Sequence, residues 1–391
     1  MQPLNDLRVL DFTTLLPGPL ATLYMAEAGA RVVKVERPTG DPSRANRPQR
    51  AGQSLQFSLL NKGKTGLVAD LKDPAELEMV RALAVEADVL VEQFRPGVMS
   101  RLGLGYDALK ADNPGLVYCS ITGFGQRGPL AQRAGHDLTY LARAGMLRLT
   151  ADGDGLPTLP PGQIADIGGG SLSAVIAILT ALLRRQRSGL GAQLDISMTE
   201  NLFPWMARAL APVLDGGDPP PPGRGRHTGG SARYGVYMSS DSVAFAVAPL
   251  EEKFWQTFCR LIGLPHELCD ENVDPVAARM GVARCLASHT AAELEAMFDG
   301  HDVCVERVRN VAEALTDPHF VERGTFSRGV IMPDGAVVPA LPMPFPDNFL
   351  ESDTQVAPML EKTGPCGSEI WGNAAGWSRW SLGDISIVQH N

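Results

Sequence analysis

A regular alternation of short apolar runs and helical segments over the first 200 residues most constrains how this chain can fold. Residues 7–12 (LRVLDF) are typical of a buried strand, and residues 30–36 (ARVVKVE) of another. Between them, residues 17–30 predict a helix with proline near its start and glycine near its end. Strands that alternate with helices predict a parallel sheet covered by helices on both faces. Ligands of such a sheet bind at the carboxyl ends of its strands.

The same unit repeats along the chain. Residues 65–71 (TGLVADL) predict a strand and residues 73–87 a helix, with Asp73 as its N-cap and Pro74 at its first position. Further short strands are expected at residues 89–94 and 116–125, separated by a helix around residues 106–114.

A proline- and glycine-rich run at residues 213–230 (VLDGGDPPPPGRGRHTGG) interrupts this pattern and indicates a linker or an extended crossing. Beyond it, the chain predicts a smaller α+β domain and a second hairpin. The expected elements are a hairpin at 232–250, helices at 251–265, 290–302 and 306–317, and a hairpin at 329–342 that turns at 333–335. The expected organisation is a large domain over 1–200, a linker over 201–227, a small domain over 228–320 and a return segment over 321–391.

Composition argues against several classes of protein. The net charge of −9 and the pI near 5.3 provide no electrostatic footprint for nucleic acid or an anionic membrane. The six cysteines form no CxxC pair, so we expect reduced thiols and no metal. The chain begins without the features of a signal peptide, and the apolar part of residues 171–189 is too short to span a bilayer. We therefore expect a cytoplasmic protein.

Few residues suggest chemistry by themselves. His136 and Asp137 are adjacent, and Asp166 precedes Gly168, Gly169 and Gly170. Such glycines either let a loop approach an oxyanion closely or pack a helix tightly on the sheet, and the pattern favours neither. Isolated His-Asp pairs and aspartates before helices are more often surface or capping groups. No phosphate-loop, dinucleotide-binding or serine-hydrolase motif is present.

The order of several longer segments along the chain is more informative about function than these single residues. They are PGP with a helix and GARVVKVERP, then NKGKTGLVADLK, VEQFRPGVMSRLGLGY, ITGFGQRGPLAQRAGHD, ADIGGGS and RRQRSGLGAQLDISM. In this order the chain resembles the family III CoA-transferase and α-methylacyl-CoA racemase superfamily up to about residue 345. The resemblance implies an α/β fold, with a Rossmann-like parallel-sheet large domain and a smaller α+β domain. It also implies an interlocked homodimer.

Two reactions compete within this superfamily. Transferases use an aspartate, matching Asp166, as a nucleophile that forms an acyl anhydride while CoA moves between an acyl-CoA and a free carboxylic acid. Members like formyl-CoA transferase also carry a glutamine where this chain has Leu16, and a run of glycines that this chain lacks at 220–260. The racemases use a histidine in a GHD motif, here His136 with Asp137, together with the aspartate before the glycines.

The racemase pattern includes a glutamate that orients the histidine. Glu251 matches it best, or Glu252 if the register slips by one residue. The pattern implies inversion of the α-carbon of a 2-methylacyl-CoA by two-base proton transfer, with backbone N–H groups near Asp137 as candidate donors to the enolate oxygen. A CoA-binding protein without activity is the third possibility, and the complete His136, Asp166 and Glu251 set argues against it.

The CoA contacts implied by the resemblance serve both reactions. Arg37 and Lys72 are expected near the adenosine and 3′-phosphate, and Arg95 and Arg101 near the pyrophosphate. Leu16, Ala69 and Leu71 would line the adenine and pantetheine path. The expected ligand is therefore acyl-CoA as substrate, with no separate cofactor, and the expected protein partner is a second copy of the chain. Arg143 and Arg233 are candidate partners for a carboxylate on the acyl group.

Overall fold

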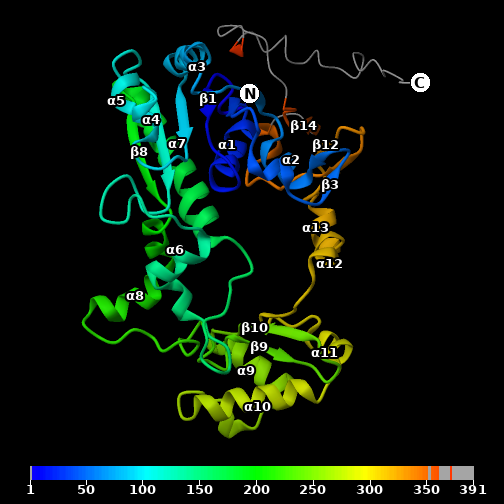
Figure 1. Ribbon diagram of the computed structural model, residues 1–391. Coiled ribbons are helices and arrows are strands. Elements are labelled where there is room, and N and C mark those ends of the chain that lie inside the picture. The colour runs from blue at the N-terminus through cyan, green and yellow to red at the C-terminus, as the bar shows by residue number, and fades with distance from the viewer. Residues whose placement is uncertain (1, 351–353, 361–369, 372–391) are drawn as a thin grey trace. The chain divides into compact units, whose positions relative to one another are not determined.

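The computed structural model describes residues 2–350, 354–360, 370 and 371, and the chain divides into two compact units (Figure 1). Unit 1 takes residues 1–135, 165–201 and 326–391, and unit 2 takes residues 136–164 and 202–325. These bounds differ from the expected ones because residues 136–164 associate with the segment after 202. The Gly223 N–H, for example, donates to the Leu149 carbonyl at 3.1 Å.

A six-stranded sheet forms the core of unit 1. Its strands, in spatial order, are β5 (Thr65–Val68), β2 (Arg31–Glu36), β1 (Arg8–Asp11), β6 (Val89–Glu92), β7 (Val117–Thr122) and β8 (Ala192–Ser197). Every neighbouring pair is parallel, as the sequence predicts. The chain runs outward from β1 to β2 and β5, then returns to β6 on the other side of β1. This is the doubly wound Rossmann strand order, with its switch point between β1 and β6.

Helices cover both faces of this sheet. All positions of β6 and β7 are buried, which requires cover on each side because successive side chains point to opposite faces. The α-helices of unit 1 are α1 (Pro17–Glu27), α2 (Leu55–Asn61), α3 (Pro74–Glu86), α4 (Val98–Arg101), α5 (Tyr106–Leu109) and α7 (Ser173–Ser188). The predicted cap of α3 is confirmed, since the Asp73 carboxylate accepts the N–H groups of Ala75 and Glu76 and Pro74 is the first helical residue.

A π-helix, η3 (Ala165–Leu172), runs directly into α7. Together they form a 24-residue helix that by length and composition alone could cross a membrane, so the expected shortness of this segment is not upheld. Within unit 1, α7 contacts β7, β8 and α1, and η3 packs on α1. The segment therefore has the contacts of a helix laid on the sheet.

The smaller elements of unit 1 include the predicted hairpin, β12 (Gly329–Ile331) and β13 (Val337–Pro339), which is confirmed. β12 also pairs in parallel with β14 (Thr354–Val356). The remaining short elements are the 3₁₀ helices η1 (Pro42–Ala45) and η6 (Asp347–Phe349) and the paired strands β3 (Gln49–Arg50) and β4 (Gln53–Ser54).

Unit 2 is an α+β unit with a three-stranded antiparallel sheet. Its strands are β9 (Gly235–Met238), β10 (Ala244–Val247) and β11 (Val305–Arg307), and β9 with β10 forms the predicted hairpin. Its α-helices are α6 (Asp137–Ala144), α8 (Ala207–Leu214), α9 (Glu252–Leu261), α10 (Pro275–Ala287), α11 (Ala291–Phe298), α12 (Val311–Leu315) and α13 (Pro318–Glu322). Its 3₁₀ helices are η2 (Met146–Leu149), η5 (His266–Leu268) and η4 (Glu200–Met206), which begins in unit 1.

Two expectations for unit 2 need correction. The helix expected over 306–317 forms only at 311–315, because residues 305–307 pair with β10 instead. The expected linker over 201–227 is partly helical, since it contains most of η4 and the whole of α8.

Candidate functional site

A cavity of about 320 Å³ in unit 1 opens where four neighbouring strands end. Phe12 follows β1, Arg37 follows β2, Ala69 follows β5, and Phe94 lies two residues beyond β6. These strands include the pair that flanks the switch point of the sheet. Open parallel sheets bind ligands at this position, because the loops after neighbouring strands diverge there.

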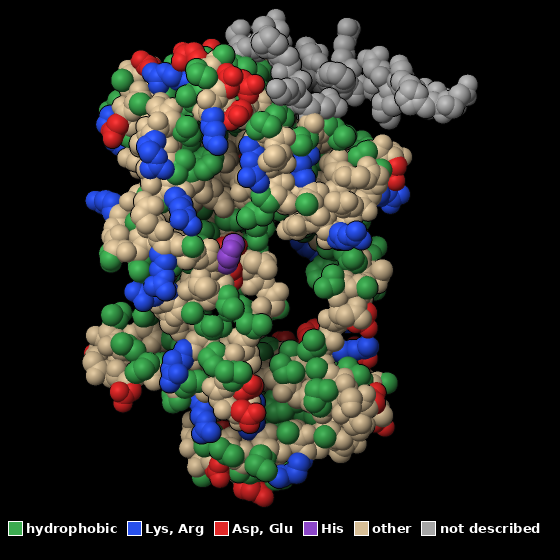
Figure 2. Space-filling view, viewed as in Figure 1, with side chains coloured by type: hydrophobic (Ala, Val, Ile, Leu, Met, Phe, Trp, Pro, Cys, Tyr) green, Lys and Arg blue, Asp and Glu red, His purple; other side chains and the backbone are tan. Residues whose placement is uncertain are grey.

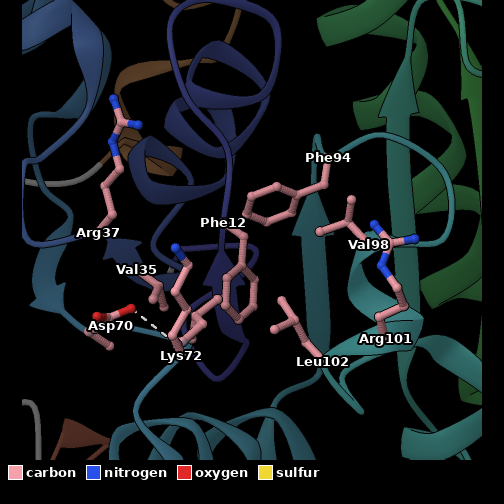
Figure 3. Close-up of a pocket in the computed structure, with 11 residues that line it drawn as sticks. Phe12, Val35, Arg37, Asp70, Lys72, Phe94, Val98, Arg101 and Leu102 are labelled. Atoms are coloured by element: carbon pink, nitrogen blue, oxygen red, sulfur yellow. Dashed lines mark hydrogen bonds between the residues drawn. The ribbon is translucent and has the colours of Figure 1, made fainter.

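The cavity combines an apolar interior with a basic rim. Figure 3 shows the Phe12 ring with Val35 and Leu102 in the middle of the pocket, and Phe94 and Val98 along its side. The cations come from different elements and stand around this apolar patch: Arg37 after β2, Lys72 before α3, and Arg101 at the end of α4. Among the charged side chains in the middle of the unit 1 surface in view, most are basic, whereas acidic ones gather at its upper rim (Figure 2).

The three cations are available to an anionic ligand. The Arg37 Nε donates to the Gly40 carbonyl at 3.1 Å, and none of the three side chains forms an ion pair with the residues that the structure describes. The one acidic residue of the lining, Asp70, accepts the backbone N–H of Lys72 at 3.0 Å rather than its ammonium group (Figure 3). Phosphate groups match such free guanidinium and ammonium donors.

The structure therefore brings together most of the residues assigned to CoA from the sequence. Arg37, Ala69, Leu71, Lys72 and Arg101 all line the cavity. The other two residues of the expected set lie outside its lining.

Arg95 is exposed, and its carbonyl accepts the Val98 N–H at 3.1 Å. Leu16 lies beside an apolar cluster formed around Leu20, Leu23 and Leu60. The Leu16 side chain therefore helps pack α1 rather than this cavity.

Glu92 is a buried carboxyl group beside the cavity that the sequence analysis did not identify. It is the last residue of β6 and only 4% exposed, and its Oε2 accepts the Phe94 N–H at 2.8 Å. Burial raises the pKa of Glu92 to about 7, against smaller opposing effects from hydrogen bonds with Ser120 and the Phe94 backbone. The sequence signal that could have identified Glu92 is its position as a carboxyl residue at the end of a hydrophobic strand.

The second predicted region, around Asp166, takes an unexpected local form. Gly168, Gly169 and Gly170 lie inside the π-helix η3, whereas the sequence led us to expect a turn before a helix starting near Ser171. A Cβ atom on Gly169 would stand 2.3 Å from the Met198 carbonyl oxygen, so this position has no room for a side chain. The glycines therefore serve close packing, and π-helical turns of this kind are frequent at functional sites.

Asp166 is half-buried in the first turn of η3. The Ser171 hydroxyl donates to the Pro17 carbonyl at 2.7 Å and lies 3.3 Å from the Asp166 carbonyl. The Asn201 amide donates to the Gly169 carbonyl at 3.0 Å. These bonds fix the helix that carries Asp166 against the start of α1.

A buried charge network fixes the loop between β1 and α1. The Lys34 ammonium lies 3.0 Å from the Asp41 carboxylate and donates to the Thr13 carbonyl at 2.7 Å. Asp41 in turn accepts the N–H of Leu15, whose φ of +65° is unusual for a residue with a side chain. Burial disfavours the Asp41 carboxylate, but Lys34 and Ser43 outweigh that effect and lower the pKa of Asp41.

Asp11 and Lys64 extend this network. The Lys64 ammonium lies 3.3 Å from Asp11 and donates to the Pro19 carbonyl, the Thr22 hydroxyl and the Asn61 amide oxygen. Charged residues in otherwise apolar runs such as RVVKVE marked these positions in the sequence, but no sequence pattern paired them.

His136 immediately precedes α6 in unit 2. Its N–H donates to the Thr139 hydroxyl at 3.0 Å, and its carbonyl accepts the Thr139 N–H at 2.8 Å. His136 is exposed, and it forms a capping box with Thr139 at the start of α6. Asp137 is the half-buried first residue of α6, at the positive end of the helix dipole.

The structure distinguishes the two candidate glutamates of unit 2. Glu252 forms an ion pair with Arg233 at 2.7 Å, whereas Glu251, the N-cap of α9, is exposed and has no such partner among the described residues. Glu251 is therefore the one of the two that is available for another role. In the part of the chain that the structure describes, no group of three or more His, Cys, Asp or Glu side chains could hold a metal ion.

Comparison with known proteins identifies the family. The model of CoA-transferase family III matches residues 4–362. The chain is 33% identical to human (Homo sapiens) alpha-methylacyl-CoA racemase over 333 residues, 83% of this chain and 82% of the relative. It is 35% identical to acetyl-CoA:oxalate CoA-transferase of Acetobacter aceti over 351 residues, 86% of this chain and 88% of the relative.

A solved structure agrees with this relationship. The crystal structure of a CAIB/BAIF family protein from Brucella suis superposes with a TM-score of 0.78 at 30% identity, covering 92% of this chain and 97% of that one. Since the family model and these relatives span most of the chain, it belongs to CoA-transferase family III, the superfamily that also contains the α-methylacyl-CoA racemases.

Proposed function

We propose that this enzyme is an acyl-CoA racemase or epimerase that inverts the α-carbon of a 2-methylacyl-CoA. One observation carries the proposal: His136, in the GHD sequence, caps α6 through its backbone while the residue remains exposed. An exposed imidazole can serve as a proton acceptor.

The reaction needs two groups, because one face of the α-carbon loses a proton while the other receives one. His136 and Asp166 supply an imidazole and a carboxyl group, which can exchange the roles of base and acid with the direction of reaction. Glu251 is the group proposed to orient His136, and its lack of an ion pair among the described residues supports that role over Glu252. A backbone N–H near Asp137, at the positive end of α6, is a candidate donor to the enolate oxygen.

The cavity in unit 1 is proposed to bind the nucleotide end of CoA. Phe12 and Phe94 offer ring surfaces for adenine, and Arg37, Lys72 and Arg101 offer donors for the phosphates. Asp166 belongs to the same unit, and η3 packs on α1, which follows β1 directly. The cavity is required by a racemase and a transferase alike.

The second candidate is CoA transfer to a free carboxylic acid through an acyl anhydride on Asp166. The resemblance to acetyl-CoA:oxalate CoA-transferase favours it. The position where formyl-CoA transferase-like members carry a glutamine is occupied by Leu16, which packs among apolar side chains. That environment supports the racemase over this type of transferase.

The proposal includes a homodimer. Large apolar side chains are exposed on α7 at Ile176 and Leu183, and near α8 at Phe203 and Leu214. Apolar surface of this kind commonly marks an interface with another chain. Light scattering coupled to size-exclusion chromatography at micromolar concentration should give twice the 41.8 kDa chain mass, and a monomer would contradict the proposal.

The activity is tested by proton NMR with 2-methylacyl-CoA in heavy water and no added acid. The α-proton signal should disappear with the wild type and persist with His136→Ala or Asp166→Ala. His266→Ala, which removes another exposed histidine of unit 2, is the matched control and should exchange normally.

The transferase gives a different pattern. It would leave the α-proton in place and form a new acyl-CoA only when a free acid is supplied. In that case Asp166→Ala would abolish transfer, His136→Ala would leave it largely intact, and the racemase assignment would be wrong.

A further inference from the structure

Unit 2 contains a cavity of its own, of about 670 Å³, to which no role has been assigned. Three segments line it: the end of η2, the turn from η4 into α8, and the proline- and glycine-rich residues 220–228. None of its lining residues belongs to the cavity of unit 1.

The proline- and glycine-rich side of the cavity has a defined backbone. The Thr228 N–H and the Gly230 N–H both donate to the Gly225 carbonyl, at 2.9 and 3.0 Å. Gly229 has a φ of +114°, and a Cβ atom there would stand 2.6 Å from the Gly223 carbonyl oxygen. The Gly223 N–H in turn bonds to Leu149 of η2, so this wall is anchored to the segment that follows α6.

The charged groups of the cavity are all basic. Arg208 comes from α8, and Arg226 and His227 come from the opposite wall, whereas no Asp or Glu lines the cavity. Neither arginine side chain has a hydrogen bond or ion pair with the part of the chain that the structure describes. Partial burial, and then the charges of Arg208 and Arg226, lower the pKa of His227.

The other surfaces of the cavity are apolar. Trp205, Met206, Pro204, Pro220 and Leu149 contribute to the lining, and Trp205 is 57% exposed. Over the part of unit 2 that holds α8, Figure 2 shows hydrophobic and basic side chains next to one another. An apolar wall with two unpaired guanidinium groups suits a molecule with a hydrocarbon body and an anionic end.

We infer that this cavity binds a carboxylate attached to an apolar chain. The guanidinium groups of Arg208 and Arg226 pair with the carboxylate, and the chain lies along Trp205 and Met206. Arg233, which the sequence suggested for this role, is only 8% exposed and already paired with Glu252 and Glu271. The carboxylate has two possible sources: a free carboxylic acid, or the far end of the acyl group of an acyl-CoA. Only the second source rests on the proposed function.

Octanoate binding, measured by titration calorimetry and by tryptophan fluorescence, tests the site with the full-length protein. Octanoate should bind saturably to the wild type and about 100-fold more weakly to the variant Arg208→Ala/Arg226→Ala, since each charge-assisted pair contributes roughly tenfold. Arg284→Ala, which removes an exposed and unpaired arginine of α10, is the matched control and should bind octanoate like the wild type. Unchanged CoA binding would confirm that the double variant is folded.

A second titration distinguishes the sources. Adipyl-CoA, whose acyl group ends in a carboxylate, is compared with hexanoyl-CoA, whose acyl group has the same length and no charge. Tighter binding of adipyl-CoA that disappears in the double variant identifies the acyl end as the source. Octanoate binding with no difference between the two thioesters identifies a free acid.

If the double variant binds octanoate and adipyl-CoA as the wild type does, or if neither carboxylate binds the wild type preferentially, the inference is wrong. Proton exchange of a 2-methylacyl-CoA whose acyl group is uncharged distinguishes a failure of this inference from a failure of the proposed function. The double variant should retain that exchange, whereas loss of exchange is expected for His136→Ala.

Discussion

Replacement of Glu92 by glutamine should stabilise the protein at alkaline pH. The Glu92 side chain ends β6 beside the unit 1 cavity, and burial raises its pKa from 4.5 to about 7. Ionisation of a carboxyl group in this place is therefore costly. Glutamine keeps an oxygen that can accept the Phe94 N–H, now bonded at 2.8 Å to Glu92, but never carries a charge.

The size of the effect follows from the two pKa values. A rise from 4.5 to about 7 corresponds to about 3 kcal/mol between the protonated and the ionised folded protein. Between these pH values the folded state retains a proton that the unfolded state has released, so the free energy of unfolding falls as pH rises towards 7. The stabilising contribution is complete below about pH 4.5 and lost above about pH 7. The variant should therefore be about 3 kcal/mol more stable than the wild type at pH 9, and about 1 kcal/mol more stable at pH 5.

Urea unfolding followed by far-ultraviolet circular dichroism at pH 5, 7 and 9 measures the difference. Glu78→Gln, which removes an exposed carboxylate from α3, is the control and should show no comparable pH dependence. A Glu92→Gln protein that is less stable than the wild type at pH 9 would refute the reasoning. It would mean that the folded protein stabilises the ionised carboxylate.

Three further predictions concern packing, ligand binding and the buried charges. Gly169→Ala should lower the free energy of unfolding by roughly 1–3 kcal/mol in urea, because the new Cβ would stand 2.3 Å from the Met198 carbonyl oxygen. Arg101→Ala should weaken CoA binding by roughly 10- to 100-fold in titration calorimetry, whereas Arg95→Ala, outside the cavity lining, should change it less than about threefold. Lys34→Met should cost about 3–5 kcal/mol in thermal or urea unfolding, because it leaves a buried carboxylate unpaired, and a stable variant would contradict that account.

The sheet of unit 1 and its cavity could be predicted from the sequence because they depend on local patterns. Short apolar runs give the strands, and in a parallel sheet the residues after neighbouring strands meet at one edge. The family resemblance assigned Ala69, Lys72 and Arg37 to one ligand, and the parallel sheet places the ends of β5 and β2 at one edge. Arg95 lies in the turn before α4 and outside the cavity lining, and its contact with CoA stays a prediction.

Other features depend on contacts that no local pattern contains. The three glycines after Asp166 are compatible with a turn or a helix, and the Met198 backbone, distant in sequence, requires the small size of Gly169. The bounds of unit 2 depend in the same way on the bond between Gly223 and Leu149. Tertiary contacts determine these features, because each local conformation would be acceptable in the absence of its partner.

The buried network explains why the loop before α1 tolerates an unfavourable backbone. Leu15, at φ +65°, would relax if its N–H lost the Asp41 carboxylate, and Lys34 together with hydrogen bonds from Ser43 keeps Asp41 ionised in the core. The loop continues into Pro17, whose carbonyl accepts the Ser171 hydroxyl from the helix that carries Asp166. The charges are thus linked to η3, which carries Asp166, through backbone geometry, without touching it. A lysine in the second strand and an aspartate after it therefore affect the position of Asp166, because they fix the loop against which η3 packs.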